Sequence, residues 1–107
     1  MVASVRMDIQ SITDALIKTI EPKKIYLFGS YARGDETENS DFDICIISGD
    51  KSKRRLDMAV TANKAIFGIT KMPVDIVVCY DDDFAERSKF TGTLEKEIAT
   101  EGVVLYG

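Results

Sequence analysis

The chain has 107 residues, of which 45% are apolar and 30% are charged. This length suffices for one modest hydrophobic core, so we expect residues 1–107 to form a single domain. The net charge of −4 argues against non-specific binding to nucleic acid, which usually needs a basic face. It does not exclude a nucleotide as ligand, because Mg²⁺ can neutralise phosphates in place of lysine and arginine.

Other features of the composition bear on location and chemistry. Residues 1–10 lack a continuous apolar stretch, and no apolar run approaches the roughly 20 residues that cross a membrane. Cys45 and Cys79 lie in apolar, strand-like segments, where we expect reduced, buried thiols, and a cytoplasmic location fits. The chain has no histidine, so acid–base chemistry must come from carboxylates, lysine, tyrosine or bound water.

The hydrophobic pattern predicts helices alternating with strands. In chain order we expect a helix over residues 4–20, a strand over 25–28, a turn beginning at Gly29-Ser30, a loop over 33–40 and a strand over 42–47. The next predicted elements are a helix over 51–67, which Gly68 ends, and a strand over 74–79. After them we expect a short helix near 84–89, capped by Asp81 or Asp82, and a helix over 93–100. A short edge strand over 103–105 is compatible with the pattern. These elements predict an α+β fold, a small sheet covered by helices.

The most informative segment runs from Gly29 to Asp43. The pair Gly29-Ser30 follows a buried strand, and ten residues later Asp41 and Asp43 flank Phe42 at the start of the next strand. Side chains alternate between the faces of a strand, so the two carboxylates point the same way. They repel each other unless a cation lies between them, and Mg²⁺ commonly binds one or two carboxylates together with substrate phosphates. The pattern predicts metal-assisted transfer of a phosphate-linked group.

Asp75 is the third candidate metal ligand. It lies between Val74 and Ile76 in the most apolar strand, where a lone charge is costly. If this strand lies beside that of Asp43, three carboxylates converge, and such a cluster can hold two Mg²⁺ ions about 3.5–4 Å apart. Taken singly, the features have ordinary explanations: a solvated strand end, a strand edge and a common turn. Their combination in this order favours a site.

Two charged features have alternative interpretations. Arg33 is placed either to contact a phosphate or ribose, or to pair with Asp35, Glu36 or another acid and hold the loop. The basic run over residues 51–55 is either a solvated helix start or a contact for an acidic partner or a nucleotide phosphate.

Three segments, residues 27–34, 40–44 and 74–77, closely resemble the motifs of the minimal nucleotidyltransferases of the DNA polymerase β superfamily. The resemblance spans nearly the whole chain. It implies a small mixed β-sheet with helices packed mainly on one face, the polymerase β-like nucleotidyltransferase fold. It also implies in-line attack of an acceptor hydroxyl on the α-phosphorus of a nucleoside triphosphate, with release of pyrophosphate.

The resemblance implies a role for each motif residue. Gly29 and Ser30 would hold the β- and γ-phosphates of the nucleotide, and Arg33 is a further candidate for nucleotide binding. Asp41 and Asp43 would ligate both of two Mg²⁺ ions. Asp75 would ligate the catalytic ion and help to deprotonate the acceptor, with ATP as the expected substrate.

The small size of the chain suggests that another chain supplies the acceptor. Prokaryotic minimal nucleotidyltransferases often pair with HEPN-domain proteins and act as antitoxins, transferring AMP from ATP onto a tyrosine of the HEPN toxin. The resemblance implies this function here. Two alternatives remain: transfer to a small molecule, for which a homo-oligomer could build the pocket, and a catalytically silent protein that masks a toxin. Transfer to DNA or RNA is disfavoured by the acidic charge.

Overall fold

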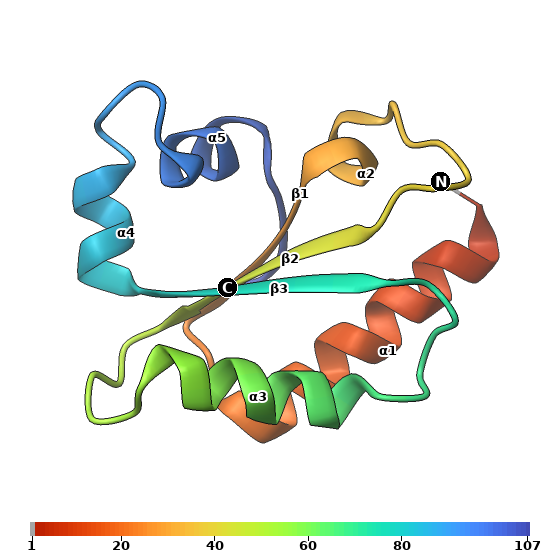
Figure 1. Cartoon of the computed structure of the whole chain (residues 1–107), viewed down its shortest axis with the longest axis horizontal. Helices are drawn as coiled ribbons and strands as arrows, with labels where there is room; N and C mark the ends of the chain where they lie inside the picture. The colour runs from red at the N-terminus through yellow and green to blue at the C-terminus, as the bar shows by residue number, and fades with distance from the viewer. Residues whose placement is uncertain (1) are drawn as a thin grey trace.

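The computed structural model describes residues 2–107, which form one mixed sheet with helices on both faces (Figure 1). The strands are β1 (Lys24–Phe28), β2 (Phe42–Ser48), β3 (Val74–Tyr80) and β4 (Val103–Tyr106). The helices are α1 (Ala3–Ile20), α2 (Gly29–Arg33), α3 (Arg55–Ile66), α4 (Asp81–Arg87) and α5 (Leu94–Glu101). The α+β architecture predicted from the sequence is confirmed, and the expected edge strand near residues 103–105 is present as β4.

The strand order in the sheet is β3-β2-β1-β4. β1 runs antiparallel to both β2 and β4, whereas β2 and β3 are parallel and are joined by the crossover helix α3. The carboxyl end of β1 therefore lies beside the amino ends of β2 and β3. In this register Asp43 has Phe28 of β1 on one side and Asp75 of β3 on the other. The topology brings the three motif segments to one end of the sheet.

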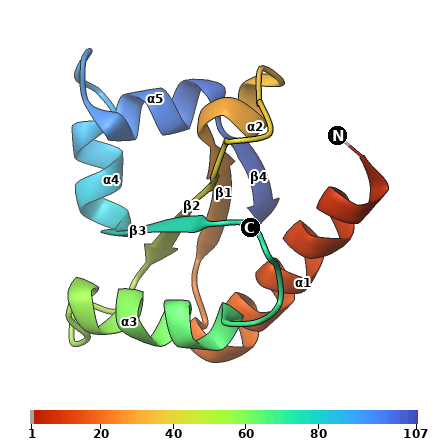
Figure 2. The ribbon, with the colours of Figure 1, turned by 45° about the vertical axis from the view of Figure 1, so that its right-hand side comes forward.

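One face of the sheet carries the larger core. α1 and α3 cover this face, and α1 contributes the periodic residues that the sequence predicted to be buried, including Ile12 and Leu16. Phe42, Ile44 and Ile46 of β2 point into the same core, as the alternation along the strand requires. Figure 2 shows the two long helices together below the strands.

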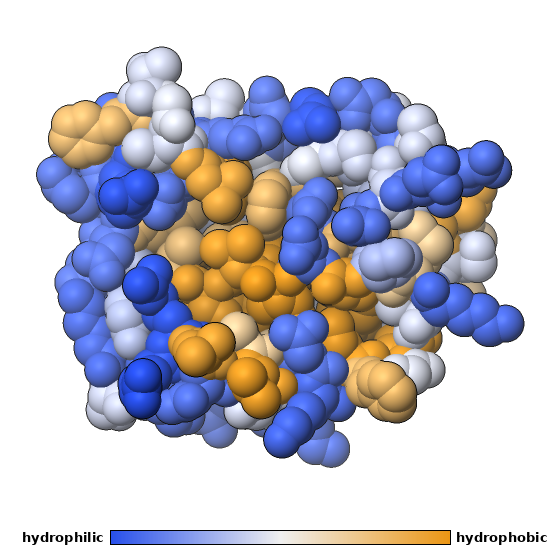
Figure 3. Space-filling model, in the orientation of Figure 1, coloured by the Kyte–Doolittle hydropathy of each residue, from blue (hydrophilic) through white to orange (hydrophobic). Residues whose placement is uncertain are grey.

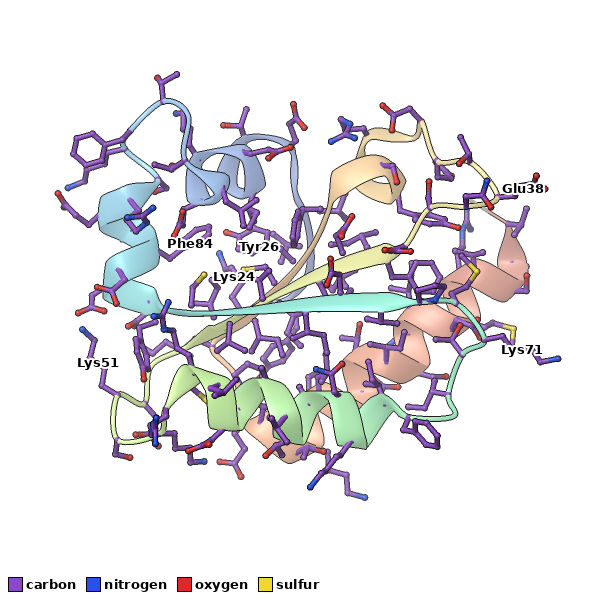
Figure 4. The ribbon with its side chains drawn as sticks, in the orientation of Figure 1. Lys24, Tyr26, Glu38, Lys51, Lys71 and Phe84 are labelled. Atoms are coloured by element: carbon purple, nitrogen blue, oxygen red, sulfur yellow. The ribbon has the colours of Figure 1, made fainter. Side chains whose placement is uncertain are left out.

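The short helices α4 and α5 cover part of the opposite face. Phe84 of α4 stacks on Tyr26 of β1 with ring centroids 5.6 Å apart, and Figure 4 shows the two rings side by side. Cys45 and Cys79 lie in this second cluster as free, buried thiols, as predicted. Because the two longest helices share one face, the expectation of helices mainly on one side holds.

Two local predictions differ from the structure. Gly29-Ser30, expected to begin a turn, instead opens the five-residue helix α2, which Gly34 closes by adopting φ 80° and donating its N–H to the Ser30 carbonyl. The long central helix begins at Arg55 and not at residue 51, because the Asp50 carboxylate accepts the N–H of Ser52 and holds the preceding segment in a turn.

The acidic residues after β3 also behave differently from expectation. Asp81 and Asp82 do not precede the short helix as caps but lie inside its first turn, since α4 begins directly after Tyr80. Their negative charges still interact favourably with the positive end of the helix dipole. Asp81 also pairs with Lys23 at 2.8 Å, which ties the start of α4 to the end of the α1–β1 connection.

The surface carries an apolar patch on the face that Figure 3 shows. Apolar side chains gather at the centre of the face shown in Figure 3, over the edge strand β3, and polar side chains surround them. Within residues 2–107, no helix combines the length and the hydropathy needed to span a membrane.

Candidate active site

The candidate site lies where β1 ends and where β2 and β3 begin. Asp43 is half-buried in β2 and faces the α4–α5 side of the sheet, opposite to Phe42 and Ile44. Asp75 is its direct partner in the parallel register and is exposed on the edge strand. Asp41 is exposed just before β2, and the backbone N–H of Phe42 bonds to the carbonyl of the residue before β3 at 3.0 Å. The fold thus places the strand of Asp75 beside that of Asp43, which is the condition that the sequence analysis set for a shared site.

The backbone of Gly29 lies against the Asp43 carboxylate. Its φ of +71° lies in the left-handed region, which favours glycine. A Cβ atom at this position would overlap Asp43 Oδ2 and would lie 3.0 Å from Asp43 Cγ. The site therefore requires glycine at position 29 for two independent reasons, the backbone conformation and the space.

Ser30 lies in the first turn of α2 and is half-buried. Its carbonyl accepts the N–H groups of Gly34 at 2.9 Å and Asp35 at 3.1 Å, so the chain folds back on itself directly after β1. On the other side of the same helix, Tyr31 packs edge-to-face on Phe42 with centroids 4.8 Å apart. These contacts anchor the Gly29–Ser30 segment between β2 and solvent.

Burial and neighbouring like charges both disfavour the ionised form of Asp43. Burial raises the pKa of the Asp43 carboxyl above its ordinary value, and the neighbouring charges of Asp75 and Asp41 raise it further. Arg33 offsets part of this rise, whereas Glu97 adds to it. A cation beside Asp43 would relieve the repulsion, so the cost of this arrangement indicates a positively charged ligand.

The donor set fits Mg²⁺ in chemistry, since aspartate oxygens are the hard ligands that this ion prefers. The three carboxylates do not converge into a closed cluster: residues 2–107 contain no group of three or more acidic or cysteine side chains close enough to hold a metal ion. The register sets Asp43 beside Asp75, but the predicted convergence of all three carboxylates is not seen, and Asp41 lies exposed before β2. Mutual repulsion of unscreened carboxylates favours this separation.

Arg33, the last residue of α2, is paired with acids. Its Nε lies 3.1 Å from Asp35 Oδ2, and its Nη1 lies 3.5 Å from Glu97 Oε1 and 3.6 Å from Glu101 Oε2. The hydrogen bond to Asp35 is the main reason that the pKa of Arg33 is raised. These ion pairs agree with the interpretation that Arg33 pairs with acids and holds the loop, although Glu36 is not among its partners. Any contact with a nucleotide stays a prediction.

Glu97 and Glu101 were not predicted to be neighbours of the site. Their spacing of four residues places them on one face of α5, and this is the one local signal they carry. Nothing in the sequence indicated that this face meets α2.

The basic run lies at the far end of the sheet from the candidate site. Lys51 pairs with Asp82 at 2.6 Å, and the hydroxyl of Tyr80 donates to the backbone carbonyl of Lys53 at 2.6 Å. β3 separates this end from Asp75 by about 17 Å, and Figure 4 shows Lys51 and Lys71 near its opposite ends. The run is therefore not placed to contact a phosphate bound beside Asp43, whereas contact with an acidic partner stays a prediction.

The fold is that of the polymerase β-like nucleotidyltransferases, as the similarity to solved structures of this class shows. The family profile described as "Nucleotidyltransferase domain" matches residues 9–106, and the chain belongs to this family. It is a minimal nucleotidyltransferase, an enzyme that transfers nucleotides.

Three relatives illustrate the similarity. "Putative protein adenylyltransferase MJ0604" of Methanocaldococcus jannaschii is 34% identical over 84 residues, which are 78% of each chain. A crystal structure of a mutant of the MntA–HpeT toxin–antitoxin is 26% identical, with a TM-score of 0.59 over 90% of this chain and 70% of that chain. A crystal structure of the toxin–antitoxin with AMP-PNP is 25% identical, with a TM-score of 0.58 over 92% and 73%.

Proposed function

We propose that this protein is an Mg²⁺-dependent adenylyltransferase that moves AMP from ATP onto a tyrosine hydroxyl of a HEPN toxin and acts as its antitoxin. One observation carries the catalytic part: Asp43 and Asp75 are register partners on the neighbouring strands β2 and β3, with the backbone of Gly29 against Asp43. The name of the MJ0604 relative supports a protein acceptor. The toxin–antitoxin neighbours, one of them holding AMP-PNP, support the toxin partner and the nucleotide.

In this proposal Asp41, Asp43 and Asp75 hold Mg²⁺, which supplies positive charge for the triphosphate and for the departing pyrophosphate. Gly29 and Ser30 bind the β- and γ-phosphates, because a residue without a side chain lets phosphate oxygens approach the backbone closely. Most of the catalytic effect then comes from positioning and from charge stabilisation.

Asp75 is proposed to accept the proton of the acceptor hydroxyl. A new bond forms between the tyrosine oxygen and the α-phosphorus, and the bond from that phosphorus to the bridging oxygen of pyrophosphate breaks. The pyrophosphate carries away the electron pair of the broken bond. Asp75 is exposed on the edge strand β3, so a side chain on a second protein can reach it. This exposure favours a protein acceptor over an enclosed small molecule.

The experiment that tests the proposal is label transfer in the presence of Mg²⁺. The protein is mixed with a lysate of its own host and with ATP labelled at either the α- or the γ-phosphate, and Asp41→Asn/Asp43→Asn serves as the inactive control. We expect label from the α position alone, on one protein band, with loss in the variant. Label confined to small molecules would instead indicate a small-molecule acceptor. Capture of a partner without any transfer, whichever nucleotide is supplied, would indicate a silent binding protein.

A further inference from the structure

The guanidinium group of Arg33 joins α2 to α5 through ion pairs. Figure 2 shows the two helices side by side at the end of the sheet where β1 ends. Arg33 ends α2, and its Nη1 pairs with Glu97 and Glu101, which lie one turn apart on α5. Asp35 pairs with Nε of the same side chain. Acids from two separate parts of the chain thus surround one arginine.

These pairs add little to stability, because the Arg33 side chain is 38% exposed and those of Glu97 and Glu101 are 46% and 43% exposed. Their effect on conformation is larger. An isolated surface arginine samples many rotamers, whereas one held on two of its nitrogens by three carboxylates has few left. The arrangement therefore defines where the guanidinium lies.

The position of this guanidinium relates it to the candidate site. α2 begins at Gly29, which lies against the Asp43 carboxylate, and ends at Arg33 one helical turn later. Phe28, the residue directly before α2, is the register partner of Asp43, so α2 starts beside the candidate site. Within residues 2–107, the carboxylates pair with Nε and Nη1, and Nη2 makes no ion pair. The two N–H groups of Nη2 match the needs of a phosphate oxygen.

We propose that Glu97 and Glu101 are positioning residues that hold Arg33 ready to bind the β- and γ-phosphates of the substrate nucleotide. The inference rests on the proposed function, since it assumes that a nucleotide binds beside Gly29 and Asp43. Holding the side chain in advance lowers the entropy lost when the phosphate binds.

Positioning of Arg33 and simple charge repulsion predict opposite changes in nucleotide affinity when the two glutamates are neutralised. Two carboxylates near a polyphosphate repel it, so their removal would strengthen nucleotide binding if repulsion were their main effect. If they position Arg33, their removal weakens binding.

The test measures binding of AMP-PNP with Mg²⁺ by calorimetry, which needs no acceptor. We expect Glu97→Gln/Glu101→Gln to raise the Kd for AMP-PNP threefold to tenfold and to leave the Kd for AMP and the melting temperature unchanged. Glu95→Gln is the matched control, because Glu95 lies on the same helix but pairs with Arg87 at 2.8 Å. It should bind both nucleotides like the wild type.

Repeating the substitutions in the Arg33→Gln variant tests whether the glutamates act through Arg33. In Arg33→Gln, the same two glutamate substitutions should cause no further rise in Kd, because they act through Arg33. The proposal would be overturned if Glu97→Gln/Glu101→Gln lowered the Kd or left it unchanged in the protein that retains Arg33. It would also be overturned if the same substitutions raised the Kd as much in Arg33→Gln as they do with Arg33 present. If the wild type does not bind AMP-PNP at all, both the proposed function and this inference are overturned. If the wild type binds AMP-PNP but substitution of the two glutamates does not change the Kd, only the inference is overturned.

Discussion

The backbone of Gly29 passes so close to the carboxylate of Asp43 that any side chain at position 29 would overlap Asp43 Oδ2. The two residues lie beside each other because β1 and β2 pair antiparallel, with Phe28 opposite Asp43. The glycine of the motif is thus coupled sterically to a candidate metal ligand, in addition to any contact it makes with phosphate.

Gly29→Ala should abolish most of the activity. The methyl group must displace the Asp43 carboxylate, and the φ of +71° costs an L-residue a further 1–2 kcal/mol, roughly. We expect transfer to fall about 100-fold or more, as misplacement of a reacting group by about 1 Å does. The measurement is label transfer together with thermal melting.

Gly34→Ala is the matched control for this prediction. Gly34 also has a positive φ, of +80°, but no atom lies within 4 Å of a Cβ built there. Gly34→Ala should lose a similar amount of stability from the strained backbone but should retain transfer. Equal activity losses in the two variants would show that backbone strain in α2, and not the clash with Asp43, is responsible.

Asp41→Asn with Asp43→Asn should remove transfer and leave the fold intact. The substitutions remove like charges that repel each other, so the free energy of unfolding should stay within about 1 kcal/mol of the wild type or rise. Thermal melting and circular dichroism provide the check. Unfolding of the variant would mean that these carboxylates are structural.

The raised pKa of Asp43 predicts a pH dependence of stability with a definite sign. A carboxyl whose pKa is higher in the folded state binds more protons when folded, so its contribution to stability falls as the pH rises from the ordinary value, near 3.9, through the raised value. Asp81 and Asp82 have lowered pKa values and act in the opposite direction. The difference in stability between wild type and Asp43→Asn isolates the effect, and it should shift against the wild type as the pH rises. A difference independent of pH would contradict the prediction.

Mg²⁺ should stabilise the wild type at neutral pH. If the ion binds the folded protein at the carboxylates, it adds roughly 1.4 kcal/mol when its free concentration is about nine times Kd. Melting with MgCl₂ and after addition of a chelator measures this. The double asparagine variant should not respond, and an equal response of the variant would place the ion elsewhere.

Lys51→Gln should leave transfer unchanged. Lys51 pairs with Asp82 and lies over the ring of Tyr80, at the end of the sheet opposite to Gly29 and Asp43. We expect the Kd for AMP-PNP to equal that of the wild type. Weaker nucleotide binding in this variant would revive the interpretation of the basic run as a phosphate contact.

Much of the molecule was predictable from local patterns. The periodicity of the first helix, the apolar strands and the carboxylates at the start of β2 are all encoded within a few residues of one another, and the structure confirms the elements they predict. The motif residues also pointed to the family. Their individual roles in binding and catalysis stay predictions, which the variants above address.

Some local predictions were wrong because a few hydrogen bonds decide at which residue a helix begins or ends. The turn at Asp50 delays α3, and the left-handed Gly34 closes a helix at Gly29–Ser30 where a simple turn was expected. Such choices differ by small free energies, so composition alone does not determine them.

The sequence by itself determined the spacing of Asp41 and Asp43, their common face and the apolar strands around them, because alternation along a strand is a local property. Only the tertiary structure decided that Asp75 is the register partner of Asp43 and that Arg33 meets Glu97 and Glu101. These pairs join segments far apart in the chain. Their formation depends on how the sheet and helices pack as a whole, and packing has no signature within a short stretch of sequence.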